Sequence, residues 1–136
     1  MLSALRIRRQ ILDALLTHAR RNAPHESCGL LAGRNVEITM FYPAENAAST
    51  PSTNFEIAPR DLFRIMRELR AADLELLAIY HSHPSSDNSP SPTDIATAYY
   101  PETAYIIVSP RADTPNPIRA FHIRDNTVTE LAIEPR

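Results

Sequence analysis

The apolar run LELLAIYHSH, residues 74–83, is the part of the sequence that most constrains the fold. It is the most apolar of the predicted strands, and Pro84 breaks it. Residues i and i+2 of a strand point to the same face, so His81 and His83 project side by side while Ser82 points the other way. We therefore expect two imidazoles at the end of a sheet, close enough to meet one ion.

Periodicity and turn residues predict the other elements. Apolar residues at helical spacing predict a helix from Ser3 to about Ala19 and a second helix from Pro59 to about Ala72. Gly33 to Asn35 separate two short apolar runs, as in a hairpin. The predicted strands cover residues 28–32, 36–42, 103–109, 118–124 and 127–133, with a long loop at 43–54, a short strand at 55–58 and a short helix at 92–100. Helices around a largely central sheet predict an α/β sandwich, formed as one domain by residues 1–136.

Composition restricts the class of protein. The chain has 136 residues, of which 43% are hydrophobic, enough for one domain with a buried core. The single cysteine, Cys28, excludes an internal disulfide, and no apolar run approaches the roughly 18 residues of a membrane span. The arginine-rich N-terminus lacks a small-residue cleavage site and does not read as a signal peptide, which favours the cytoplasm. A net charge of -2 gives no general attraction to nucleic acid, and the composition carries no signal for or against oligomerisation.

A further feature follows the two histidines, in the segment SPTD at residues 91–94. It has the form of a helix start, with Ser91 at the N-cap, Pro92 in the first turn and Asp94 three residues after the cap. Ser91 and Asp94 could form a capping box with no chemistry at all. If the loop folds back, Asp94 can instead be a third ligand beside His81 and His83, and the two roles are compatible. Two histidines, one carboxylate and an open fourth position describe a catalytic zinc site.

The segment HSHPSSDNSPSPTD, together with the glutamate of PHESCGLLAG, resembles the JAMM or MPN-plus zinc-dependent isopeptidases. The motif of that family is a distant glutamate, then H-x-H, seven residues, serine, two residues and aspartate, and the match is complete. The segment ESCGLLAG looks most like the small bacterial members that act on ubiquitin-like sulfur-carrier proteins. The resemblance implies an α-β-α sandwich of the JAMM/MPN type, which is cytidine-deaminase-like.

The resemblance also implies a role for each motif residue. His81, His83 and Asp94 would bind Zn2+, Glu26 would be the general base, and Ser91 would help to stabilise the oxyanion. Zinc lowers the pKa of its bound water to about 7, which supplies a nucleophile at neutral pH. The implied reaction is hydrolysis of the amide bond after the C-terminal Gly-Gly of a ubiquitin-like sulfur-carrier protein. Without the resemblance, Glu26 would be interpreted as a surface carboxylate.

Two alternatives remain open from the sequence. Cys28 lies two residues from a carboxylate and could be the nucleophile of a cysteine hydrolase, although it also begins an apolar run in which a buried cysteine packs well. The chain could also be a non-catalytic interaction module of the MPN type. A zinc deaminase is excluded because the chain has neither an H-x-E nor a P-C-x-x-C segment. His18, His25 and His122 have no comparable partners and are expected to be ordinary residues.

Overall fold

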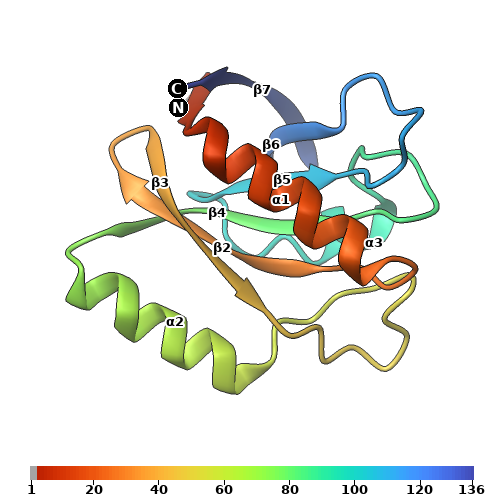
Figure 1. The fold of residues 1–136 in the computed structure, drawn as a ribbon, viewed down its shortest axis with the longest axis horizontal. Coiled ribbons are helices and arrows are strands. Elements are labelled where there is room, and N and C mark those ends of the chain that lie inside the picture. The colour runs from red at the N-terminus through yellow and green to blue at the C-terminus, as the bar shows by residue number, and fades with distance from the viewer. Residues whose placement is uncertain (1–2) are drawn as a thin grey trace.

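The computed structural model describes residues 3–136 and arranges their strands in one curved sheet (Figure 1). The order across the sheet is β1-β3-β2-β4-β5-β6-β7, and β1 also pairs with β7, so the sheet closes into a barrel. The pairs β1·β3, β1·β7 and β4·β5 are parallel, and the other neighbours are antiparallel. The strands are β1 (Ala4–Ile7), β2 (Cys28–Arg34), β3 (Glu37–Ala44), β4 (Glu75–Ser82), β5 (Ala104–Val108), β6 (Ile118–Arg124) and β7 (Thr127–Pro135).

The two long helices pack against opposite faces of the sheet. The helix α1 (Arg9–Asn22) crosses in front of the strands in Figure 1, and α2 (Pro59–Ala71) lies below β2 and β3. Because side chains alternate along a strand, Tyr80 packs in the cluster that includes α1, and Ile79 packs in the cluster that includes α2. The predicted α/β sandwich is confirmed, while the closure of its sheet by β1 was not predicted.

The prediction of a helix from Ser3 is wrong for its first residues. Residues 4–7 form β1, in which Leu5 and Ile7 are fully buried and Arg6 is exposed. This alternation of period two is too short to separate from helical spacing by sequence alone. Pairing with β3 and β7, far away in the chain, decides the outcome, and the helix begins only at Arg9.

Apart from the strand at 55–58, the other predicted strands and the second helix are confirmed within two residues at each end. In the β2–β3 hairpin, Asn35 takes the positive φ that the turn requires, at 58°. Gly33 lies at a bulge, where a Cβ atom would stand 1.8 Å from the carbonyl oxygen of Glu37. The strand predicted at 55–58 is wrong, because this segment forms only an isolated bridge between Asn46 and Ile57.

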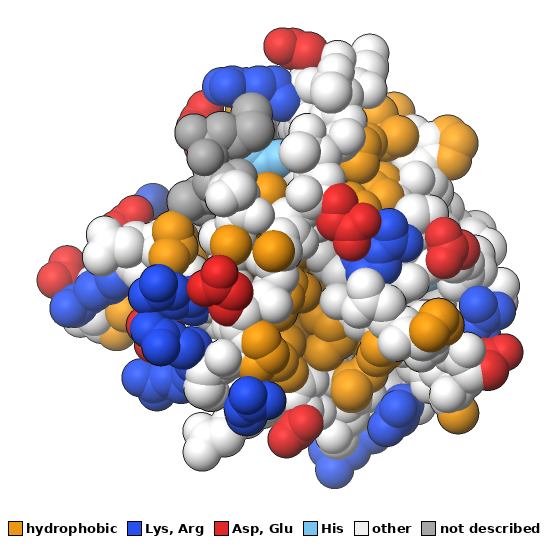
Figure 2. All heavy atoms as spheres, turned by 90° about the horizontal axis from the view of Figure 1, so that it is seen from above, with side chains coloured by type: hydrophobic (Ala, Val, Ile, Leu, Met, Phe, Trp, Pro, Cys, Tyr) orange, Lys and Arg blue, Asp and Glu red, His pale blue; other side chains and the backbone are white. Residues whose placement is uncertain are grey.

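The surface seen in Figure 2 carries basic and acidic side chains interspersed with hydrophobic ones. The expectation of no nucleic-acid partner stays a prediction. Across residues 3–136, every helix is too short or too polar to cross a membrane.

Candidate metal centre

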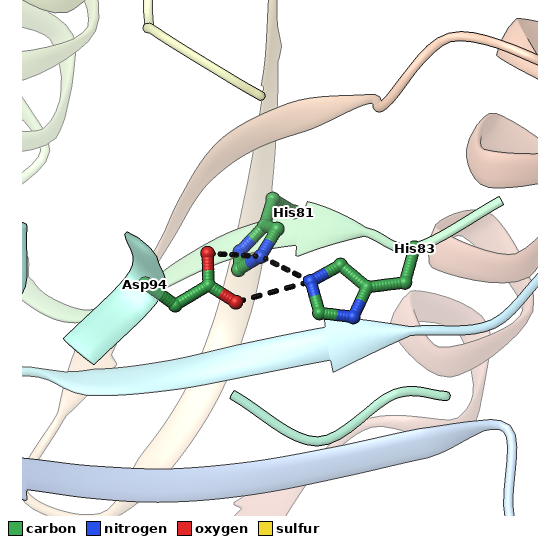
Figure 3. A group of neighbouring side chains, drawn as sticks. All are labelled: His81, His83 and Asp94. Carbon is green, nitrogen blue, oxygen red and sulfur yellow. Dashed lines mark hydrogen bonds and ion pairs between the residues drawn. The ribbon is translucent and has the colours of Figure 1, made fainter. Parts of the chain in front are cut away.

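Strand β4 carries the two histidines to the end of the sheet. It lies between β2 and β5, and its last residue is Ser82. The backbone N–H of His83 still donates to the carbonyl of Val108 in β5, at 2.9 Å, so the chain keeps its extended course for one more residue. His81 and His83 consequently point to the same side, as predicted (Figure 3).

Asp94 reaches the histidines from the short helix α3 (Pro92–Ala96). The predicted capping box forms: the Ser91 hydroxyl accepts from the Asp94 N–H at 3.0 Å, and the Ser91 N–H donates to Asp94 Oδ2 at 2.9 Å. The helix ends at Ala96 rather than near Tyr100. The cap fixes the direction of the Asp94 side chain, so its capping role is confirmed and is compatible with the ligand role, which stays a prediction.

The donor atoms of the three residues converge on one point. His81 Nε2 lies 3.0 Å from His83 Nε2 and 3.2 Å from Asp94 Oδ1, and His83 Nε2 lies 3.0 Å from Asp94 Oδ2. Tetrahedral zinc ligands with bonds of about 2.0–2.1 Å lie roughly 3.3 Å apart, so this spacing needs little adjustment to hold zinc. The donor set, two imidazoles and a carboxylate, is also one that zinc prefers.

The loop after β4 sets the tautomer of His83. Its Nδ1–H donates to the carbonyl of Asp87 at 2.7 Å, which leaves the lone pair of Nε2 directed at the site. Asn88 is buried and ties this loop to the strands by donating to the carbonyl of Asn116 at 2.9 Å. Such a bond to the second ring nitrogen is typical of metal-binding histidines.

Burial and mutual hydrogen bonding set the charges of the three groups. Burial lowers the pKa of His81, and Asp94 offsets this only in part. Burial also lowers the pKa of His83, but hydrogen bonds to Asp94 and Asp87 outweigh it and the net shift is upward. Burial alone would raise the pKa of Asp94, yet its bonds to both histidines hold the pKa well below its usual range. Asp94 is therefore ionised, the form required of a metal ligand.

Glu26 lies just before β2 and is buried, with 6% of its surface exposed. Burial raises the pKa of its carboxyl to about 7, with the charge that His83 carries when protonated opposing this rise and the negative charge of Asp94 adding to it. Ser27, the next residue along the chain, accepts the Ser82 N–H at 3.1 Å, so the backbone of Glu26 lies close to the end of β4 that carries the histidines. Glu26 is thus no surface carboxylate, and its protonation can change near neutral pH.

Cys28, the alternative nucleophile, lies on β2 next to His81 in the strand register but is fully buried. Burial raises the pKa of its thiol to about 12, with the negative charges of Asp61 and Glu26 adding to the rise. A catalytic cysteine needs the opposite environment, one that favours the thiolate. The structure therefore argues against the cysteine hydrolase.

We expect Cys28 to resist alkylation in the folded protein. Its thiol is buried and almost entirely protonated at pH 8, so iodoacetamide should label the native chain at least about a hundredfold more slowly than the chain unfolded in guanidinium. Mass spectrometry of timed samples measures both rates. Rapid labelling of the native protein would restore the thiol as a candidate nucleophile.

Several contacts of the site could not be predicted from the spacing of residues in the sequence. The ring of Phe55 stacks on that of His81, with centroids 4.3 Å apart and an interplanar angle of 15°. On the opposite face of β4, the Ser82 hydroxyl accepts from the Ser27 N–H at 2.8 Å, and Ser27 in turn bonds the Tyr80 hydroxyl. These bonds join the chain beside Glu26 to the strand that carries the histidines. Pairs of this kind depend on which strands become neighbours.

The remaining histidines lie apart from the three ligand candidates. His18 on α1 lies 3.2 Å from the Tyr80 hydroxyl, His122 is buried in β6, and His25 is exposed. In residues 3–136, the one group of three or more potential ligand residues that could hold a metal is His81, His83 and Asp94. The expectation that the other histidines are ordinary residues agrees with these positions.

Comparison with known proteins identifies the family of the chain. A family model described as prokaryotic homologs of the JAB domain matches residues 8–124. The chain is 34% identical over 126 residues to the CysO-cysteine peptidase of Mycobacterium tuberculosis, which covers 91% of this chain and 86% of that protein. It is 38% identical over 104 residues to the desampylase of Haloferax volcanii, covering 72% and 75% respectively. The solution structure of a Desulfitobacterium hafniense protein, 28% identical, superposes with a TM-score of 0.85 over 97% of this chain and 92% of that one. The chain therefore belongs to the JAMM/MPN family, in its prokaryotic JAB branch.

Proposed function

We propose that the protein is a zinc metallopeptidase that hydrolyses the amide bond after the C-terminal Gly-Gly of a ubiquitin-like sulfur-carrier protein. The observation that carries the proposal is the convergence of His81, His83 and Asp94. The buried Glu26 adds to it, because its neighbour Ser27 is hydrogen-bonded to Ser82, between the two histidines. The names of the two relatives, CysO-cysteine peptidase and desampylase, support hydrolysis and argue against a non-catalytic module. The cytoplasmic setting stays a prediction.

His81, His83 and Asp94 would hold the metal, and Glu26 would move the proton. When bound, zinc would activate a water molecule and polarise the scissile carbonyl. Glu26 takes the proton of the attacking water and then passes it to the leaving amine. A pKa of about 7 suits a group that must accept and release a proton in one cycle near neutral pH.

Ser91 would stabilise the developing oxyanion. Its hydroxyl oxygen already accepts the Asp94 N–H, so the hydroxyl hydrogen is left to donate to a second partner. The capping box fixes the Ser91 side chain beside Asp94 before substrate arrives. A donor that needs no reorganisation is the kind that lowers the barrier of acyl transfer.

The free side of β3 offers a place for the substrate tail. Strand β1 pairs with β3 only at Glu37 and Ile38, so within the described chain the rest of β3, to Ala44, is paired along one side only, by β2. Cys28 is the register partner of both Ala44 and His81, so this edge runs toward the metal centre. An extended tail could add to it as a further strand, and glycines would fit where no side chain can pass beside the metal.

We expect the protein to cleave a ubiquitin-like carrier extended beyond its terminal Gly-Gly by an amino acid or short peptide, and to release the carrier ending in Gly-Gly. Replacing the last glycine by valine should lower kcat/KM at least about tenfold, roughly 1.4 kcal/mol of transition-state stabilisation, because the β-branched side chain obstructs the approach to the metal. Mass spectrometry of the products identifies the bond that is cut.

An unfolded peptide without a carrier fold serves as the control substrate. Equal cleavage of that peptide, or indifference to the valine, would refute the carrier specificity while leaving the metal-dependent hydrolysis intact. Activity that persists in protein freed of metal would refute the hydrolysis mechanism itself.

A further inference from the structure

The loop at residues 45–58, which joins β3 to α2, is built against the metal centre. Its two ends pair with each other: the Ala47 N–H donates to the Glu56 carbonyl at 2.7 Å, and the Ala58 N–H donates to the Glu45 carbonyl at 3.0 Å. Between these ends the loop has no regular ladder. Other contacts must therefore determine its course.

One side chain, that of Asn46, makes five of those contacts. Its amide oxygen accepts from two backbone N–H groups, and its amide nitrogen donates to backbone carbonyls. The acceptor bonds come from Ala48 and Glu56, both at 3.0 Å, and the donor bonds go to Glu26 at 3.0 Å, Asn54 at 2.9 Å and Pro51 at 3.5 Å. An asparagine amide has two donor hydrogens and two acceptor lone pairs, so the two acceptor bonds and the two shorter donor bonds use its whole capacity, and the longer contact to Pro51 shares a hydrogen with one of them.

The bond from Asn46 to Glu26 matters because Glu26 lies outside the sheet. Strand β2 begins at Cys28, so no strand neighbour fixes the backbone of residue 26. The loop provides both of its backbone partners: the Glu26 N–H donates to the Pro51 carbonyl at 2.7 Å, and the Glu26 carbonyl accepts from Asn46. The backbone from which the Glu26 carboxyl extends is thus held by this loop.

The same loop also contacts His81, one of the three ligand candidates. Phe55, which stacks on the His81 ring, follows directly after Asn54, whose carbonyl accepts from Asn46. Among the described residues, Nδ1 of His81 has no hydrogen-bond partner, so stacking rather than hydrogen bonding at that nitrogen orients the ring. Asn46 is in this way connected to the base and to one ligand.

We propose that Asn46 is a positioning residue for Glu26. It holds the loop at residues 45–58 against the backbone of Glu26, and so directs the carboxyl toward the metal centre. The role of Glu26 as the base belongs to the proposed function, on which this inference rests. The attachment of Asn46 to the Glu26 backbone can be tested independently of it.

The kinetic test compares Asn46→Ala with Asn46→Asp and uses Asn54→Ala as the matched control. Asn46→Asp keeps the acceptor bonds within the loop and loses the donor bond to Glu26, so it serves if the alanine variant folds poorly. Asn54→Ala removes a different loop bond, from the Asn54 side chain to the Thr50 hydroxyl at 2.8 Å, and leaves Glu26 untouched. We expect both Asn46 variants to retain zinc and to lose at least about tenfold in kcat with less effect on KM, and the control to stay within about twofold of wild type.

A double variant separates positioning from general damage. If Asn46 acts through Glu26, adding Asn46→Ala to Glu26→Gln should cost little further residual turnover. Fully additive losses, or wild-type kcat in both Asn46 variants, would overturn the inference.

Hydrogen exchange decides the matter even if the wild-type protein cleaves no Gly-Gly conjugate. Asn46→Ala should speed amide exchange in peptides covering residues 24–28 and 53–57, whereas Asn54→Ala should affect only residues 49–54. Unchanged exchange at residues 24–28 would overturn the inference and leave the proposed function standing. If Asn46→Ala speeds exchange at residues 24–28 but the wild-type protein cleaves no Gly-Gly conjugate, the proposed function is refuted and the positioning by Asn46 stands.

Discussion

Glu26→Gln should abolish nearly all turnover while the protein keeps its fold and its zinc. The amide is close to the carboxyl in shape, so the buried position is filled, but it cannot accept the proton of the attacking water. General acid–base groups typically contribute about 10²–10⁴-fold, and we expect kcat to fall by at least about a hundredfold. Steady-state kinetics and metal analysis of the same preparation measure the two properties together.

Cys28→Ala is the matched control for that variant. Cys28 lies in the adjacent strand and is buried like Glu26, but it has no role in the proposed chemistry. Its removal should cost some stability from lost packing and should leave kcat within about threefold of wild type. An inactive Cys28→Ala variant together with an active Glu26→Gln variant would show that the protein is a cysteine hydrolase instead.

Removing one of the three ligand candidates should have the largest effect of all. The wild-type protein should carry about one zinc per chain, and His81→Ala or His83→Ala should bring both zinc content and activity to background, because two remaining ligands hold the ion poorly. Inductively coupled plasma mass spectrometry gives the metal content. A chelator should inactivate the wild type, and added zinc should restore it. Full activity in metal-free wild-type protein would end the metallopeptidase proposal.

Asp94 needs a finer comparison because it both caps α3 and faces the histidines. Asp94→Asn keeps an oxygen that can accept the Ser91 N–H but loses the charge, so zinc should be lost while α3 persists. Ser91→Ala loses one capping bond, worth about 1 kcal/mol of stability, and should retain zinc while lowering kcat through the lost oxyanion donor. Equal zinc loss in both variants would show that the helix cap, not the carboxylate, is what the ion requires.

The placement of the histidines could be predicted because it depends on local geometry alone. Alternation along β4 fixes the shared face of His81 and His83, and the capping box at Ser91 fixes the direction of Asp94 whatever the rest of the fold does. The sequence does not predict whether the loop folds back to bring Asp94 to the histidines. The buried Asn88, which anchors that loop, gives no sign of its partner in the sequence.

Features that depend on pairing between distant parts of the chain could not be predicted from the sequence. Glu26 has no local pattern that marks it as buried, because its cover is the loop held by Asn46. The strand nature of residues 4–7 likewise comes from partners at the far end of the chain. In both places the local signal is weak and tertiary contacts decide.

The closure of the barrel by β1 has a consequence for how the protein is made. Arg6 of β1 pairs with Glu134 of β7 across a separation of 128 residues, so on the ribosome the first strand must wait for nearly the whole chain before its parallel partner emerges. Until then Leu5 and Ile7, fully buried in the finished barrel, have no β7 to cover them. Glu26 and the three ligand candidates, ending at Asp94, have all been synthesised by that time. The residues of the candidate metal centre are therefore synthesised before β7, the strand that β1 needs to close the barrel.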